Sequence, residues 1–204
     1  IMPVQLNGRV VNMDPILEIA KKENLLIIED SCQSLGASYK GTQAGTFGAA
    51  GTFSFFPAKT LGCFGDGGAI ITSDDNLAKK LKMLRDHGRD PSDGKAKVFG
   101  FNGRLDNLHA AILDLKLKFY DEDIARRRDI ATLYQTSLGH LPQLNLPPAP
   151  NSQPDHFDVF QNYEIQADNR DQLKDYLSKQ GVGTILQWGG YTINDFNDLG
   201  DWGS

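Results

Sequence analysis

The sequence has 204 residues, of which 40% are hydrophobic and 23% are charged, and its formal net charge is −5. This composition is typical of a soluble globular protein, long enough for one large domain or two small ones. The negative charge gives no electrostatic basis for binding nucleic acid or an anionic membrane, and no apolar run approaches the ~20 residues of a membrane span. We therefore expect a cytoplasmic protein with neither kind of partner.

The chain contains two cysteines, Cys32 and Cys63. Their spacing matches no metal-binding pattern, and the histidines show no metal-ligand spacing either. We predict free thiols in a reducing compartment and no metal site. A single disulfide between the two cysteines is the alternative.

The first ninety residues alternate helices with short apolar strands, which predicts a layered α/β domain. Residues 1–6 read as the end of a strand leading into a loop, so we expect the chain to be the C-terminal part of a longer protein. Asp14 and Pro15 read as the cap and first residue of a helix. Residues 25–28 are wholly apolar, which predicts a strand buried on both faces. The elements expected in this part are a helix at 14–23, strands at 25–28, 52–56 and 69–72, and a helix from the cap at 73–75 to about residue 88.

A long helical pattern and a proline-rich connector dominate the second half. The helical pattern covers 104–138, and the connector at 141–154 holds five prolines. A strand at 160–166, a helix at 170–180 and a strand at 182–187 then predict a small α/β domain. We place the domain boundary after residue 115, so that 1–115 form part of a large domain. Residues 116–204 then comprise the linking helix, the connector and the small C-terminal domain.

Four polar residues lie near the ends of the predicted strands: Asp30, Gln33, Ser54 and Lys59. In α/β sheets, ligands bind at the carboxyl ends of the strands. Pyridoxal 5'-phosphate (PLP) needs a lysine amine for its aldehyde and a carboxylate that keeps its ring nitrogen protonated. Its phosphate needs hydroxyl and backbone N–H donors at glycine-rich turns, and its ring oxygen needs a polar neighbour. The four side chains can supply these groups.

Several ordered motifs resemble those of the DegT/DnrJ/EryC1/StrS aminotransferases, which are fold-type I PLP enzymes acting mostly on nucleotide-linked keto sugars. The resemblance covers essentially residues 3–138. Its motifs are EDSCQS (29–34), FSFFPAK (53–59), GDGGA (65–69), LRDHG (84–88) and GFNGRLD (100–106). It implies an α/β fold that forms part of the large domain of a fold-type I PLP-dependent transferase, followed by a small C-terminal α/β domain.

The resemblance also implies a role for each matching residue. Lys59 would hold PLP and then act as the acid–base that moves the proton between carbon atoms. Asp30 would pair with the pyridine nitrogen, Gln33 would contact the ring oxygen or face, and Ser54 would bind phosphate. Asn102 would reach the phosphate of the neighbouring subunit's cofactor, which implies a homodimer with shared active sites.

The implied reaction is a two-stage exchange in which an amino donor, typically glutamate, aminates the cofactor, which then aminates a keto sugar attached to a nucleotide. Family members that dehydrate the sugar carry histidine at the lysine position, and Lys59 argues against that variant. Family members also have a long N-terminal segment that is not visible here. The alternative is therefore a catalytically incomplete module that serves only in dimerisation or binding.

Other polar groups have simpler interpretations. A loop lysine such as Lys59, taken alone, is usually a solvated charge. His87 lies at a helix end, where it can cap carbonyl groups. Residues 126–128 are three consecutive arginines, most simply a solvated helix face. Trp188 can pack in a core or line a sugar pocket, and the sequence does not decide between these.

Overall fold

A computed structural model describes residues 1–192 and 195–196 of the chain. Its contacts divide the chain into two compact units. The first unit comprises Ile1–His140 and Leu146–Glu164, and the second comprises Leu141–Asn145 and the residues from Ile165 onward. The domain boundary that we expect after residue 115 stays a prediction, because these units reflect contacts within this chain alone.

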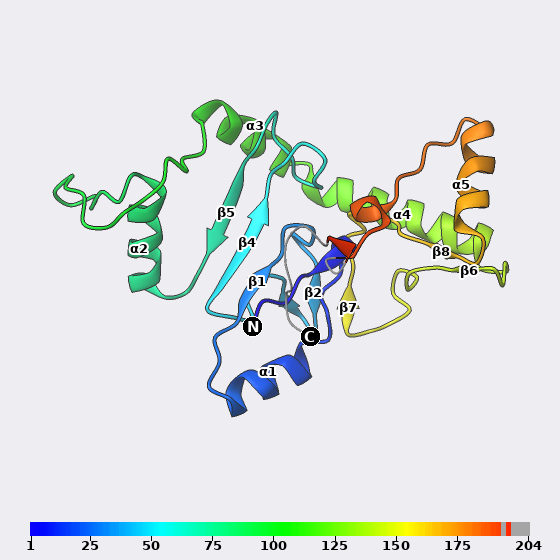
Figure 1. The fold of residues 1–204 in the computed structure, drawn as a ribbon, viewed down its shortest axis with the longest axis horizontal. Helices are drawn as coiled ribbons and strands as arrows, with labels where there is room; N and C mark the ends of the chain where they lie inside the picture. Colours follow the sequence, from blue (N-terminus) through cyan, green and yellow to red (C-terminus); the bar gives the residue numbers. More distant parts are fainter. Residues whose placement is uncertain (193–194, 197–204) are drawn as a thin grey trace. The chain divides into compact units, whose positions relative to one another are not determined.

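The described residues form a mixed α/β structure (Figure 1). The helices are η1 (Leu6–Gly8), α1 (Met13–Lys22), α2 (Asp75–Arg85), α3 (Asn107–Leu117), α4 (Tyr120–Leu138), α5 (Arg170–Lys179) and η2 (Gln187–Gly190). The strands are β1 (Ile28–Asp30), β2 (Ser38–Tyr39), β3 (Thr42–Gln43), β4 (Ala50–Ser54), β5 (Gly68–Ile71), β6 (Leu144–Asn145), β7 (His156–Phe157) and β8 (Gln166–Ala167).

The sheet that positions the site has the strand order β1-β4-β5. Strand β1 runs parallel to β4, with Asp30 opposite Thr52, and β5 runs antiparallel to β4. Figure 1 shows the three strands side by side. Because β1 and β4 are parallel, their carboxyl ends lie at the same edge of the sheet. The predicted strands at 52–56 and 69–72 are confirmed to within about two residues at each end.

The prediction of a strand at 25–28 buried on both faces is wrong. Strand β1 begins later, at Ile28, and its residues alternate between exposed and buried. Leu26 is 74% exposed and Ile28 is 42% exposed, whereas Ile27 is buried. An apolar run predicts a sheet covered on both faces only when other elements cover them. Within this chain, one face of β1 carries the core.

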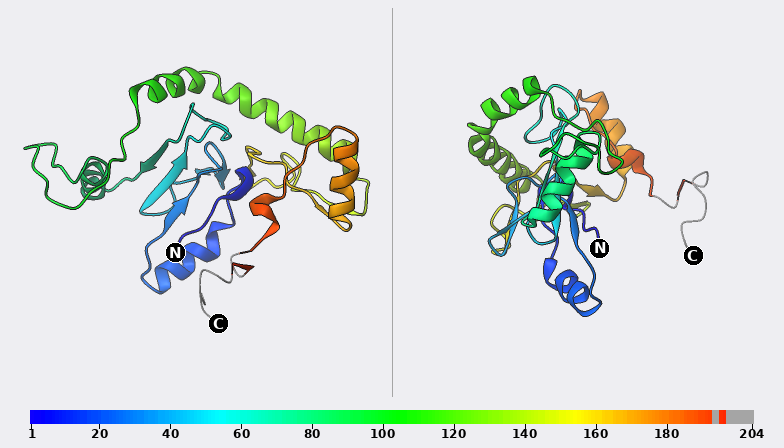
Figure 2. Two further views of the ribbon diagram at one scale, coloured as in Figure 1. Left: turned by 45° about the horizontal axis from the view of Figure 1, so that its top comes forward. Right: turned by 90° about the vertical axis from the view of Figure 1, so that its left-hand side faces the viewer.

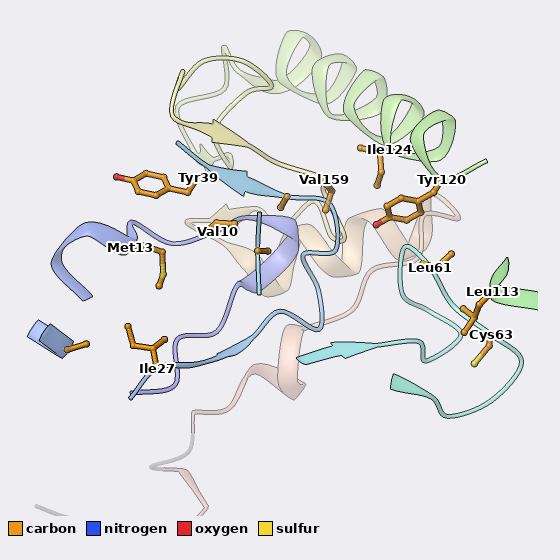
Figure 3. Close-up of a cluster of buried hydrophobic side chains, with 13 residues drawn as sticks. Val10, Met13, Ile27, Tyr39, Leu61, Cys63, Leu113, Tyr120, Ile124 and Val159 are labelled. Carbon is orange, nitrogen blue, oxygen red and sulfur yellow. The ribbon is translucent and has the colours of Figure 1, made fainter. Parts of the chain in front are cut away.

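The hydrophobic core of the first unit is one cluster of buried side chains drawn from segments far apart in the sequence. Figure 3 shows Met13 and Ile27 at one end of the cluster and Leu61, Cys63 and Leu113 at the other. Each fully buried side chain of this kind stabilises a fold by roughly 1.5–3 kcal/mol. The core therefore ties the loop after β4 to helix α3.

The helices follow their local signals with two differences. Asp74 caps α2 as predicted, accepting the backbone N–H groups of Asn76 and Leu77 at 2.8 and 3.1 Å. Helix α1 is capped by Asn12, two residues earlier than predicted. The predicted helix at 104–138 is two separate helices, α3 and α4 (Figure 2), because the chain leaves the helical path at Phe119 before α4 begins.

The second unit contains a two-stranded antiparallel sheet of β6 and β8 and the helix α5. Helix α5 lies within one residue of its predicted bounds. The predicted strand at 182–187 is wrong, because residues 182–186 have no strand conformation and Ile185 is 91% exposed. The predicted strand at 160–166 is reduced to the pair in β8, which pairs with β6 rather than with a later strand.

Two predictions from composition can be compared with the described residues. Cys32 and Cys63 are free thiols, which confirms the prediction and excludes the disulfide alternative. None of the helices described is long and apolar enough to cross a membrane.

Candidate active site

Asp30 and Ser54 lie at the ends of the parallel strands β1 and β4. One carboxylate oxygen of Asp30 accepts the backbone N–H of Cys32 at 3.1 Å. The Ser54 hydroxyl accepts the backbone N–H of Phe56 at 3.2 Å. Short-range bonds of this kind compete with continued strand pairing and fix a side chain where the strand ends. Both residues are half-buried.

Lys59 lies in the loop that follows β4, which we call the lysine loop (residues 56–62). Its backbone N–H donates to the carbonyl oxygen of Phe56 at 2.9 Å. A Cβ atom on Gly62 would lie 2.6 Å from the carbonyl oxygens of both Phe56 and Pro57, so this tight closure requires glycine. Pro57 and Ala58 are exposed, whereas Lys59 is half-buried. The loop therefore closes on itself, and Lys59 is less exposed than the two residues before it.

The charges of both Asp30 and Lys59 affect the thiol of Cys32. Burial raises the pKa of the Cys32 thiol, and the hydrogen bond and negative charge of Asp30 raise it further. The Lys59 charge acts on the same thiol in the opposite direction. Asp30 and Lys59 are 29 positions apart in the sequence, and they lie at the end of β1 and in the loop after β4, two parallel strands whose carboxyl ends share one edge of the sheet.

The other two predicted site residues have different settings. The Gln33 side-chain oxygen accepts the backbone N–H of Asn7 at 2.7 Å, which ties the turn after β1 to η1. Asn102 is exposed and forms an isolated antiparallel bridge with Asp86 beyond α2. Among the residues that the structure describes, no hydrogen bond or ion pair joins Asn102 to Lys59. The cofactor roles of both residues stay predictions.

Glu29, the residue before Asp30 in β1, is not among the predicted site residues, and its carboxylate accepts hydrogen bonds from four N–H groups. Its side chain is completely buried. It accepts the side-chain N–H of Gln5 and the backbone N–H of Gly45, both at 2.9 Å, and those of Phe47 and Gly48 at 2.6 and 3.3 Å. Buried carboxylates are stable in proteins when such donors match them. Glu29 therefore fixes the loop at 45–48 against β1 and has a structural role.

Two of the three consecutive arginines do not form a solvated helix face, so that interpretation is wrong for them. Arg127 donates to the carbonyl oxygens of Phe160 and Gln161 at 3.1 and 3.3 Å. Arg128 donates to the carbonyl oxygen of Asp158 at 2.7 Å. A cationic helix face can bind a returning segment through that segment's carbonyl groups. The two arginines hold residues 158–161 against α4.

The residues at the sheet edge fit a PLP-type group in their chemistry. The carboxylate of Asp30 and the hydroxyl of Ser54 lie at adjacent strand ends, and the amine of Lys59 belongs to the loop that follows β4. A metal ion is a different case: among the described residues, no group of three or more histidine, cysteine, aspartate or glutamate side chains could hold one.

Comparisons with known proteins match most of the chain. It is 40% identical over 188 residues to the UDP-2-acetamido-2-deoxy-3-oxo-D-glucuronate aminotransferase of Pseudomonas aeruginosa, covering 92% of this chain and 51% of that protein. It is 38% identical over 190 residues to the dTDP-3-amino-3,4,6-trideoxy-alpha-D-glucose transaminase of Streptomyces venezuelae, covering 92% and 48%. The crystal structure of NtdA from Bacillus subtilis with bound cofactor PMP is similar with a TM-score of 0.74 and 32% identity, covering 87% and 40%.

The chain thus spans about half the length of the curated relatives that it matches. The predicted fold class is confirmed, while the small C-terminal α/β domain stays a prediction. The family profile described as the DegT/DnrJ/EryC1/StrS aminotransferase family matches residues 1–192. The chain therefore belongs to the DegT/DnrJ/EryC1/StrS aminotransferase family.

Proposed function

We propose that the chain is the lysine-bearing part of a PLP-dependent aminotransferase that transfers an amino group to a nucleotide-linked keto sugar. The observation that carries this proposal is the position of Asp30 at the end of β1 and of Lys59 in the loop after β4, at the edge where these two parallel strands end. The relatives' names support it, because they describe transamination of UDP- and dTDP-linked sugars. PMP, bound in the solved relative, is the aminated form of PLP.

When bound, PLP supplies an electron sink for the substrate carbon that changes its bonds. Lys59 would hold the cofactor covalently and, once released, carry a proton to and from that carbon. Asp30, at the end of β1, would keep the ring nitrogen protonated. Ser54 would donate its hydroxyl to the phosphate, and Gln33 would contact the ring. Glutamate as the amino donor follows from the family resemblance.

A homodimer with shared sites is part of the proposal. Asn102, the residue expected to reach the partner's cofactor, follows Phe99 and Phe101, which are 102% and 73% exposed, and Leu108 a few residues later is 70% exposed. Several large exposed apolar side chains in one stretch of the chain agree with a contact surface there. A cytoplasmic location is also proposed, with which the two free thiols agree.

The test is cofactor capture by the purified chain. We expect excess PLP to produce the visible absorbance of lysine-bound PLP, and borohydride reduction with mass spectrometry to locate the added mass on Lys59. Lys59→Ala removes both signals. Lys80→Ala, at an exposed position on α2, is the matched control and keeps them. A folded, dimeric chain that stays colourless in excess PLP would instead support a module without turnover.

A further inference from the structure

We propose that Gln161 is the positioning residue of Lys59, holding the lysine loop in the orientation that presents the amine to the cofactor. The inference rests on the proposed function of Lys59. It concerns a side chain about a hundred residues further along the chain. Gln161 belongs to the first unit, as Lys59 does.

The side-chain amide of Gln161 forms hydrogen bonds to the backbone on both sides of Lys59. Its oxygen accepts the backbone N–H of Thr60 at 2.8 Å, and its nitrogen donates to the carbonyl oxygen of Ala58 at 2.8 Å. These two backbone groups belong to the residues immediately before and after Lys59. Together they define the peptide planes on both sides of the lysine Cα atom, and so the direction in which its side chain leaves the loop.

Gln161 is itself held firmly. Arg127 donates to the carbonyl oxygens of Phe160 and Gln161, which anchors this segment to α4. The Val159 N–H donates to the carbonyl oxygen of Gly8 at 2.8 Å. A Cβ atom on Gly8 would lie 2.6 Å from the backbone nitrogens of Phe160 and Gln161, so only glycine permits this approach. A side chain positions its neighbour well only when its own backbone is fixed.

A second side chain, Tyr120, also holds the lysine loop. The Thr60 hydroxyl lies 2.9 Å from the phenolic oxygen of Tyr120, and that phenol donates to the carbonyl oxygen of Leu35 at 2.8 Å. Thr60 and Tyr120 are both buried. Tyr120 therefore links the lysine loop to the turn after β1, which carries Asp30. Gln161 and Tyr120 therefore both hold Thr60, the residue after Lys59, and Gln161 also holds Ala58, the residue before it.

Position 161 requires an amide, because the side chain must accept the backbone N–H of Thr60 and also donate an N–H to the carbonyl oxygen of Ala58. Gln161→Glu keeps the acceptor for the Thr60 N–H but loses the donor to Ala58. Gln161→Ala loses both. Gln43→Ala is the matched control, since Gln43 is exposed on β3. Measurements are amide hydrogen exchange of residues 58–60 without PLP, the unfolding temperature without PLP, and PLP affinity from the absorbance titration.

We expect Gln161→Ala to speed exchange of the Thr60 amide and to weaken PLP binding about tenfold, the scale of two lost hydrogen bonds. Gln161→Glu keeps Thr60 protected and falls between wild type and Gln161→Ala in affinity. A merely structural role would lower the unfolding temperature and leave PLP affinity of the folded protein unchanged, which overturns the inference. Wild-type exchange and affinity in Gln161→Ala overturn it as well. A wild-type chain without lysine-bound PLP is a separate result, because it refutes the proposed function itself.

Discussion

Glu29 and Asp30 are adjacent carboxylates with opposite surroundings. Glu29 points into the interior, is completely buried, and accepts four N–H groups from a glutamine side chain and the loop at 45–48. Asp30 lies at the carboxyl end of the strand, is half-buried, and accepts the backbone N–H of Cys32. Successive residues of a strand face opposite sides, so one position separates the two environments.

The difference shows how a strand can carry structure on one face and a site on the other. A carboxylate whose acceptor sites are all matched has no valence left for a ligand. A carboxylate with one local partner keeps valences for a ring nitrogen. The comparison predicts that stability depends on Glu29 and cofactor binding on Asp30, and substitutions at the two positions can separate these effects.

Glu29→Ala is expected to have the largest effect on stability. It leaves the Gln5 amide and the backbone N–H groups of the loop at 45–48 buried without an acceptor, which costs about 3–5 kcal/mol of the free energy of unfolding. Urea unfolding followed by circular dichroism measures this loss. Glu18→Ala, on the exposed face of α1, is the control and should change stability by less than about 0.5 kcal/mol. A loss of that small size at Glu29 would contradict the structural role.

Asp30→Asn is expected to produce the reverse pattern. The amide oxygen can still accept the Cys32 N–H, so the free energy of unfolding should change by less than about 1 kcal/mol. The lost negative charge should weaken PLP binding by about tenfold or more, since hydrogen bonds to charged groups are the stronger class. Absorbance titration with PLP, beside the same urea unfolding, measures both quantities. Unchanged affinity would remove Asp30 from the cofactor site.

The smallest expected effect on stability comes from His156. In contrast to the fully hydrogen-bonded Glu29, its Nδ1 atom is buried and has no hydrogen-bond partner among the described residues. Burial lowers the pKa of His156, and the nearby Arg9 charge lowers it further, while Asp158 and Asp155 raise it. The unfolded chain therefore takes up the proton more readily. Protonation of His156 therefore favours the unfolded state. The protein has its full stability with respect to this group above the ordinary histidine pKa of about 6.5, and it loses stability as pH falls below that value.

His156→Phe keeps a ring against Tyr39, whose ring centroid lies 4.9 Å from that of His156. We expect the variant to lose less stability than wild type between about pH 7.5 and pH 5.5, a range that spans the ordinary histidine pKa. Thermal unfolding at both pH values measures the difference. Equal losses in the two proteins would show that another group controls the acid sensitivity.

Much of the fold followed from local signals. Asp74 as a cap, the bounds of α5 and the positions of β4 and β5 all depend on a few neighbouring residues, and the structure has them close to where the sequence predicts them. Predictions that depended on distant neighbours were wrong. The apolar run at 25–28 resembles a doubly covered strand, and residues 182–187 resemble a paired one, but the covering or pairing element is a tertiary property.

The candidate site divides in the same way. Asp30 and Lys59 were identified by motif and by their positions at strand ends, and the structure has them at and just after the ends of the parallel strands β1 and β4. Glu29 and Gln161 were missed because no local pattern distinguishes a structural glutamate from a solvated one, or a positioning glutamine from any other. Their partners lie 16 to 103 positions away. The sequence LLIIED at 25–30 shows no alternation of apolar and polar residues, so the burial of Glu29 is seen only in the structure.

The two bonds of Gln161 have a consequence for how the protein is made. They close chain loops of 101 and 103 residues. Synthesis proceeds from the N-terminus, so Lys59 leaves the ribosome long before Gln161 has been made. Other contacts must also offset the entropy lost in closing so large a loop before the two hydrogen bonds can form. The lysine loop should thus be an early product of translation and a late event in folding. A nascent chain released before residue 161 would carry Lys59 without the amide that bonds to the backbone on both sides of it.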